Sequence, residues 1–279
     1  DELNRMAVEL KEWMQTQQAL SMAMEVQQSL LPAATPSPRG LDIAGESRFC
    51  DATGGDYYDF IDVSETGDQA TLIALGDVMG HGVAAALLMA SARAALRAHA
   101  SEEGSLARLM TKVNQVLAED NRHQRFMTMV LAVVEPTRGA VRWASAGHDP
   151  MIHYDPSTDS FRELEGGDLP LGVMEGTDYS EYRASDLAEG SILMIGTDGI
   201  WEARNEEGEM FGKERLRDAI RRNHQRPAAD IGAAIEADLD AFCGAGSPTD
   251  DVTFVIARVT ASPSDASADD ESHAPAAAD

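Results

Sequence analysis

Hydrophobic residues recur at alternating spacings of three and four along residues 1–31 of the chain. Neither glycine nor proline interrupts this run before Pro32. The positions on the seam are apolar apart from two glutamines, and they are Leu3, Met6, Leu10, Trp13, Gln17, Leu20, Met24, Gln27 and Leu31. This heptad pattern predicts one long helix. Two interpretations stay open: a helix that packs on its own domain, and a dimeric coiled coil whose glutamines weaken the seam and set its register.

A proline-rich linker over residues 32–40 separates this helix from a region where the hydrophobic pattern predicts both strands and helices. The expected strands cover residues 41–49, 57–63, 71–75, 126–134, 140–146, 151–154, 161–164, 179–183, 191–196 and 252–259. The expected helices cover residues 83–99, 106–117, 213–223 and 228–242. This order is not the strict alternation of a parallel α/β fold. It favours an α+β domain over residues 41–260, in which paired helices cover two antiparallel sheets.

The charge of the chain limits the partners it can have. The 279 residues carry a formal net charge of −26, and the sequence pI is about 4.4. Nucleic acids and anionic membranes both require a basic protein face, so we expect neither as a partner. No apolar run reaches the length of a membrane span, and Cys50 and Cys243 lack metal-binding spacing. These features favour a cytoplasmic protein with buried thiols, followed by a disordered acidic tail over residues 261–279.

Acidic residues mark the ends of four expected strands. Asp77 and Asp198 follow apolar runs, whereas Asp56 and the pair Asp250 and Asp251 directly precede apolar runs. Acids therefore close two strands and open two others. If such strands run antiparallel in one sheet, all four acidic clusters meet at the same edge.

Several carboxylates at one edge would repel one another unless a positive charge lies between them. An all-oxygen ligand set without a cysteine or histidine cluster indicates Mg²⁺ or Mn²⁺. The convergence of several carboxylates favours two ions rather than one. The sequence therefore predicts a two-metal site at this edge.

Seven short motifs occur in one order along the chain. They are GGDYYDF at 54–60, GDVMGHG at 76–82, AGH at 146–148, LPLGV at 169–173, TDGIWEARN at 197–205, MFG at 210–212 and TDDVT at 249–253. Together they resemble the PPM family of metal-dependent serine/threonine phosphatases. The branch is the bacterial one typified by the stage II sporulation protein E (SpoIIE) and sigma-B regulator phosphatases. The resemblance covers residues 26–259 and implies an α-β-β-α sandwich around two Mn²⁺ or Mg²⁺ ions.

The resemblance also implies roles for individual residues. The implied metal ligands are Asp56, Asp77, the Val78 carbonyl, Asp198, Asp250 and Asp251. Asp77 would bridge both metals, and Asp56 matches an acid that often binds through water. Asp251 lies next to a ligand position and is a candidate in an alternative register. Asp77, Asp56, Asp198 and Asp250 would also be the residues on which catalysis depends.

The implied reaction is hydrolysis of phosphoserine or phosphothreonine by a metal-activated water, with no covalent protein intermediate. The branch indicates a STAS-type anti-sigma factor antagonist as substrate, within a partner-switching pathway. Because the chain begins with Asp1, we expect a longer protein whose upstream sensor acts through a homodimer of residues 1–31. The main alternative is a catalytically silent phosphatase fold that binds a partner. A two-metal nucleotide enzyme is disfavoured, because the sequence contains no phosphate-cradling GxxxxGK[ST] loop.

Four further residues of interest are two histidines, an arginine and an aspartate. His81 and His148 are candidate general acids for the leaving oxygen, or they form hydrogen bonds in glycine-rich turns. Arg48 is the candidate for phosphate binding. Asp149 occupies the position after AGH where this branch commonly carries Asn, and the sequence assigns it no role.

Overall fold

The computed structural model describes residues 2–50, 53–63, 70–101, 104–120, 125–244 and 250–260. The expected tail over 261–279 lies outside the described residues. The helices are α1 (Glu2–Gln28), α2 (Val83–His99), the 3-10 helix η1 (Pro136–Arg138), α3 (Leu106–Asp120), α4 (Gly212–Asn223) and α5 (Ala228–Cys243). The strands are β1 (Leu41–Arg48), β2 (Tyr57–Asp62), β3 (Thr71–Val78), β4 (Met127–Glu135), β5 (Ala140–Ala146), β6 (Met151–Asp155), β7 (Ser160–Leu164), β8 (Tyr182–Ala184), β9 (Ile192–Gly196) and β10 (Val252–Val259).

The strands form two five-stranded sheets. One has the order β1-β10-β9-β6-β7 and the other the order β2-β3-β4-β5-β8. Every pair of neighbouring strands in both sheets is antiparallel. The predicted α+β fold with two antiparallel sheets is therefore confirmed. The acidic segments, however, are divided between the sheets, because β2 and β3 belong to one and β9 and β10 to the other.

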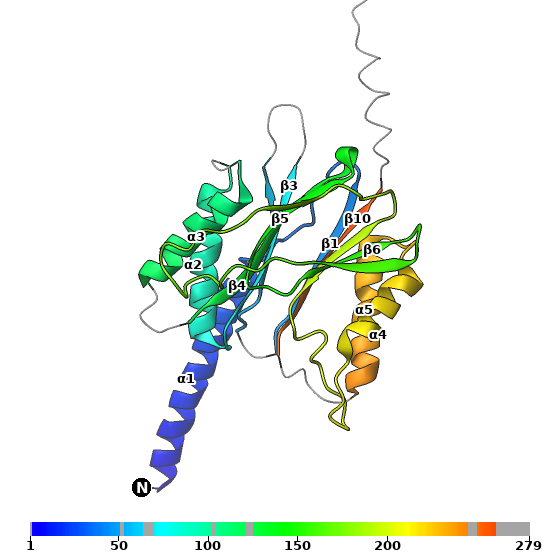
Figure 1. Ribbon diagram of the computed structural model, residues 1–279. Helices are drawn as coiled ribbons and strands as arrows, with labels where there is room; N and C mark the ends of the chain where they lie inside the picture. Colours follow the sequence, from blue (N-terminus) through cyan, green and yellow to red (C-terminus); the bar gives the residue numbers. More distant parts are fainter. Residues whose placement is uncertain are drawn as a thin grey trace, which may run out of the picture.

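Alternating side chains build four layers, with α2 and α3 outside one sheet and α4 and α5 outside the other (Figure 1). In β3, Leu72 and Ala74 pack toward α2 and α3, whereas Ile73 and Leu75 face the opposite sheet. Strands buried on both faces need apolar residues at successive positions, which explains their continuous apolar runs. The core between the sheets and the two cores beneath the helices make the α-β-β-α sandwich.

Strand β3 is longer than the sequence pattern predicted. We expected it to end at residue 75, but the ladder continues to Val78, so Asp77 is paired with Thr128 of β4. Gly76 permits this extension, because a methyl group there would lie 2.6 Å from the Thr128 carbonyl oxygen. Asp77 is thus held by strand geometry rather than by a flexible turn.

Helix α1 projects away from the sandwich and joins it only near its C-terminal end (Figure 1). Gln27 is 3% exposed, and Leu31 packs on the core, whereas Met6, Leu10 and Trp13 are exposed. The packed-helix interpretation therefore holds for the C-terminal end of this segment, and the dimeric coiled coil stays a prediction for the exposed part. Across the residues that the structure describes, no helix has the length and apolar character needed to cross a membrane.

Candidate active site

The two sheets bring the acidic segments together at one end of the sandwich. Asp77 lies at the end of β3, and Asp56 directly precedes β2, its antiparallel neighbour. On the other sheet, Asp198 follows β9, and Asp250 precedes β10, which pairs with β9. A hydrogen bond from the Thr197 hydroxyl to Oδ2 of Asp56, at 2.9 Å, joins the two sheets at this end.

The acids at this end lie close enough to repel one another when they are charged. Burial raises the pKa of Asp56 well above its usual range, and the charge of Asp77 raises it further. The pKa of Asp77 is raised to about 7, by burial first and then by Asp198 and Asp250. Burial and the charge of Asp250 also raise the pKa of Asp198. The charged groups that most affect these three pKa values are all carboxylates, so the cluster would be stabilised by added positive charge.

The donor set suits a hard divalent cation, although the side chains do not form a closed cage. Among the described residues, no three acidic, histidine or cysteine side chains lie in a metal-holding arrangement. The groups that converge are carboxylate and carbonyl oxygens, which Mg²⁺ and Mn²⁺ prefer. The mutual repulsion of buried carboxylates is the imbalance that such ions offset.

The loop before β2 approaches the end of β3 closely. A methyl group on Gly55 would lie 2.6 Å from the Val78 carbonyl oxygen and 3.3 Å from Oδ1 of Asp77. The Val78 N–H also donates to the Gly55 carbonyl at 3.3 Å. Only a residue without a side chain permits this contact, so the glycine beside Asp56 brings that acid to Asp77.

Asp251 holds this loop from the other sheet. Its carboxylate accepts hydrogen bonds from the backbone N–H groups of Cys50, at 2.8 Å, and Gly55, at 2.9 Å. The side chain is buried beside the other acids. The structure thus places Asp251 in the cluster, with both carboxylate oxygens engaged by backbone donors.

The two histidines occupy different positions. His148 is buried between the sheets, where Nδ1 lies 2.9 Å from the Thr128 hydroxyl and Nε2 lies 3.2 Å from the Gly196 carbonyl oxygen. Burial lowers its pKa to about 4, so the neutral ring links the sheets at neutral pH. These contacts match the hydrogen-bonding interpretation of His148. His81 is exposed in the turn between β3 and α2.

Arg48 ends β1 opposite Val252, the residue that follows Asp251, but its side chain pairs with another acid. It extends from β1 toward α5, where its Nη1 lies 2.7 Å from Oδ1 of Asp240. This partly exposed ion pair is the contact that the structure shows for Arg48, and its role in phosphate binding stays a prediction.

Sequence reasoning missed two residues that the structure connects to the site, Gln27 and Thr197. Gln27 stood out only as a polar position on a heptad seam. Its side chain donates to the Gly54 carbonyl at 2.6 Å and accepts from the Gly54 N–H at 3.2 Å. Both contacts depend on tertiary structure, and only the break in the apolar seam marked Gln27 in advance.

A sandwich of two antiparallel sheets with helices outside each places the chain among PP2C-type domains. The structure titled the SiaA-PP2C domain of Pseudomonas aeruginosa has a TM-score of 0.74 at 26% identity, over 88% of this chain and 98% of that one. The structure of RsbX in complex with magnesium has a TM-score of 0.60, over 81% of this chain and 99% of that one. Its identity is 16%, so this likeness concerns the fold alone.

The chain belongs to the family described as Stage II sporulation protein E (SpoIIE), whose model matches residues 67–260. Phosphoserine phosphatase RsbU of Bacillus subtilis (strain 168) is 30% identical over 189 residues, which cover 68% of this chain and 55% of RsbU. The chain spans about half the length of the curated relatives it matches, with shares of 55%, 40% and 49%.

Proposed function

We propose that this chain carries a Mn²⁺- or Mg²⁺-dependent phosphatase domain that hydrolyses phosphoserine or phosphothreonine in proteins. The observation that carries the proposal is the meeting of Asp56, Asp77, Asp198 and Asp250 from two sheets, where burial and neighbouring carboxylates raise the pKa values of the first three. Membership of the SpoIIE family and the likeness to a named phosphoserine phosphatase support the same reaction.

The four acids and the Val78 carbonyl would hold two divalent ions. When bound, such ions lower the pKa of a coordinated water and offset charge on the phosphoryl oxygens. The residues of the chain position these ligands: Thr197 orients Asp56 through its hydroxyl, and strand pairing fixes Asp77. We assign Asp251 to anchoring the loop before β2, because both of its oxygens accept backbone N–H groups.

The substrate we propose is a phosphorylated STAS-type anti-sigma factor antagonist in a bacterial partner-switching pathway. This assignment rests on the resemblance of the sequence motifs to the SpoIIE branch. RsbU, the relative with 30% identity, is named a phosphoserine phosphatase, which supports a phosphoserine protein as substrate.

We also propose that α1 transmits a signal from an upstream sensor through a homodimer. Met6, Leu10 and Trp13 lie on one seam of the helix and are exposed, as expected for a surface that a second copy covers. The other end of the helix reaches the site, because Gln27 holds Gly54, two residues before Asp56. Deleting residues 1–31 should change both the oligomeric state and the rate; equal values for both would contradict this role.

The test of the phosphatase proposal is hydrolysis of p-nitrophenyl phosphate with Mn²⁺, with Mg²⁺ and with EDTA. Activity should require metal and should be lost in Asp77→Asn. Asp178→Asn provides the matched control, because Asp178 is exposed in a loop and is not among the acids that raise the pKa values of Asp56, Asp77 and Asp198. Metal binding without turnover would favour the silent binding module, and activity that survives Asp77→Asn would place the site elsewhere.

A further inference from the structure

Lys213 lies at the start of α4, where the chain returns to the segment that follows Asp198. The Gly212 N–H donates to the Trp201 carbonyl at 2.9 Å, and Nζ of Lys213 lies 4.8 Å from the centroid of the Trp201 ring. Nζ is also 3.2 Å from Oδ1 of Asp149. The Lys213 side chain is 27% exposed, so its charge remains accessible to a ligand.

Asp149 connects this lysine to the acidic cluster. It directly follows His148, whose ring meets the carbonyl at the end of β9, shortly before Asp198. The charge of Asp149 is among those that raise the pKa of Asp198. Lys213 therefore places a positive charge against an acid that lies within electrostatic range of a proposed metal ligand.

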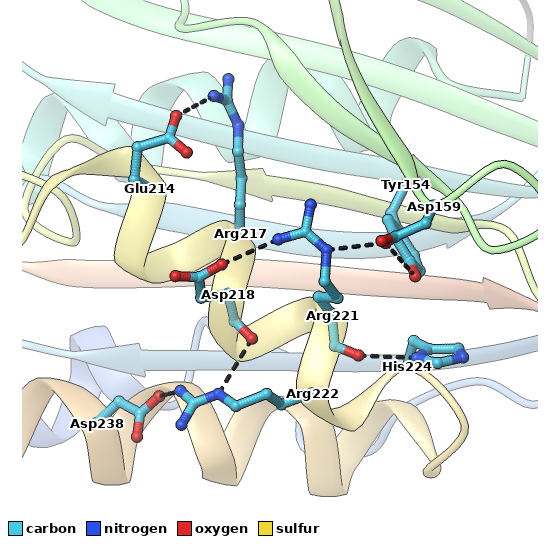
Figure 2. Close-up of polar contacts among 9 residues, drawn as sticks. All are labelled: Tyr154, Asp159, Glu214, Arg217, Asp218, Arg221, Arg222, His224 and Asp238. Carbon is cyan, nitrogen blue, oxygen red and sulfur yellow. Dashed lines mark hydrogen bonds and ion pairs between the residues drawn. The ribbon is translucent and has the colours of Figure 1, made fainter.

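The arginines farther along α4 are engaged in ion pairs with nearby acids. Figure 2 shows Arg217 with Glu214, Arg221 with Asp218 and Asp159, and Arg222 with Asp238. These contacts hold α4 to the β6–β7 hairpin and to α5. Lys213 instead has Asp149 as its nearest acid, at 3.2 Å; Glu163, at 3.8 Å, is held more closely by Arg217, at 2.8 Å.

We propose that Lys213 and Asp149 form a charge pair that sets the balance between metal binding and phosphate binding at this site. Lys213 is a positioning residue for the dianionic phosphate monoester, and Asp149 offsets its charge so that divalent cations still bind. This inference rests on the proposed phosphatase function. It concerns residues that neither ligate the metal nor react.

If this pair sets the charge of the site, a change in its charge should affect Mn²⁺ binding and phosphate ester binding in opposite directions. Removing the positive charge with Lys213→Met makes the site more negative. Mn²⁺ should then bind more tightly and the KM for p-nitrophenyl phosphate should rise, each by about fivefold, as for one unit charge several ångströms away in a partly solvated site. Asp149→Asn should shift both quantities in the opposite directions by a similar factor. Both shifts should shrink at high salt.

The experiment measures Mn²⁺ affinity by calorimetry and KM at saturating Mn²⁺ for both single variants and for Lys213→Met/Asp149→Asn. The double variant has the same net charge as the wild type, so both quantities should return to within about twofold of wild type. Lys213→Arg keeps the charge and should restore both values. Lys112→Met is the matched control. Lys112 is exposed on α3, which covers the β2-β3-β4-β5-β8 sheet, whereas Asp198 follows β9 of the other sheet.

Three outcomes would overturn the pair. Single variants that shift both ligands in the same sense would indicate a structural role for the Lys213–Trp201 contact. A double variant whose Mn²⁺ affinity and KM both worsen by the combined effects of the single variants would also indicate a structural role. Single variants with unchanged Mn²⁺ affinity and KM would mean that the pair lies too far from the site to influence it. If the wild type binds Mn²⁺ but hydrolyses nothing, the phosphatase proposal fails while calorimetry still decides the pair; a wild type that binds no Mn²⁺ overturns both.

Discussion

Asp59 and Asp77 lie on neighbouring strands, yet their side chains have opposite surroundings. Asp59 is fully buried and accepts two hydrogen bonds from Arg97, both at 2.6 Å, and one from the Tyr57 hydroxyl at 2.6 Å. The charged groups that affect Asp77 most are acids, and its pKa is raised to about 7. A buried acid with a complete set of donors stabilises a fold, whereas one surrounded by like charges indicates a site that awaits a cation.

The Asp59–Arg97 pair yields a stability prediction. Arg97→Leu removes the guanidinium but leaves the carboxylate fully buried, so the free energy of unfolding should fall by about 3 kcal/mol. Asp59→Asn should cost less, because Arg97 is 42% exposed and water can solvate its charge. Urea denaturation measures both.

Arg226→Leu serves as the control, because Arg226, in the connection between α4 and α5, forms an exposed ion pair with Asp230 of α5. Its loss should cost below about 1 kcal/mol. Equal losses for Arg97→Leu and Arg226→Leu would contradict the structural role assigned to Asp59.

His148 predicts how stability depends on pH. Its pKa is lowered to about 4 by burial, so between that value and its ordinary pKa near 6.5 the unfolded chain binds a proton that the folded chain does not. The free energy of unfolding should therefore fall as pH drops through this window, by up to about 3 kcal/mol. The acids with raised pKa values have the opposite slope, so the measured quantity is the difference between wild type and His148→Gln. A difference that does not change from pH 7 to pH 4 would contradict the buried neutral ring.

At the scale of elements, the loop before β2 is held from two sides. Gln27 of α1 pairs with both backbone groups of Gly54, while Asp251 of the opposite sheet holds Gly55. Asp56 is thus positioned by a helix and by a sheet that are far apart in sequence. A shift of α1 along its axis would therefore act on the loop that carries Asp56.

Gln27→Leu tests this coupling. The substitution keeps an apolar seam but leaves the N–H and carbonyl of Gly54 without their partners, so Asp56 should be less well positioned. The Mn²⁺ concentration for half-maximal activity should rise by about tenfold, since lost hydrogen bonds of this kind cost about 1–3 kcal/mol. Gln17→Leu is the matched control, because Gln17 lies on the same seam and is exposed. An effect of equal size in both variants would remove Gln27 from the site.

The strands and helices were largely predictable from the sequence, because hydrophobic periodicity reports burial directly. The helix over 83–99 and the strand over 252–259 match α2 and β10 at both ends. The end of β3 was missed, since its extension depends on the close approach that Gly76 allows. The acids were recognisable from their positions at strand ends. Their division between two sheets and the Lys213–Asp149 contact depend on packing, which no local pattern records.

For the whole molecule, the distribution of the acids makes the site a junction between two sheets. Asp56 and Asp77 belong to the β2–β3 side, and Asp198 and Asp250 to the β9–β10 side. Asp198 and Asp250 raise the pKa of Asp77 across this junction, so the acids oppose close approach of the sheets, while the core between the sheets and the His148 link hold them together. A bound divalent ion would convert this repulsion into a cross-link.

Metal addition should therefore raise the melting temperature of the wild-type protein. At a hundredfold excess over Kd, binding to the folded state alone adds about 2.7 kcal/mol, which corresponds to roughly 5–10 °C for a domain of this size. Asp77→Asn should differ from the wild type in two melting temperatures measured by calorimetry, one without metal and one with Mn²⁺. Its metal-free form should melt above the metal-free wild type, because a repelled buried carboxylate has been replaced by a neutral amide, and Mn²⁺ should add little. An Asp77→Asn protein that is less stable without metal would mean that its carboxylate supports the fold, and a Mn²⁺ shift equal to that of the wild type would mean that Asp77 does not hold the ion.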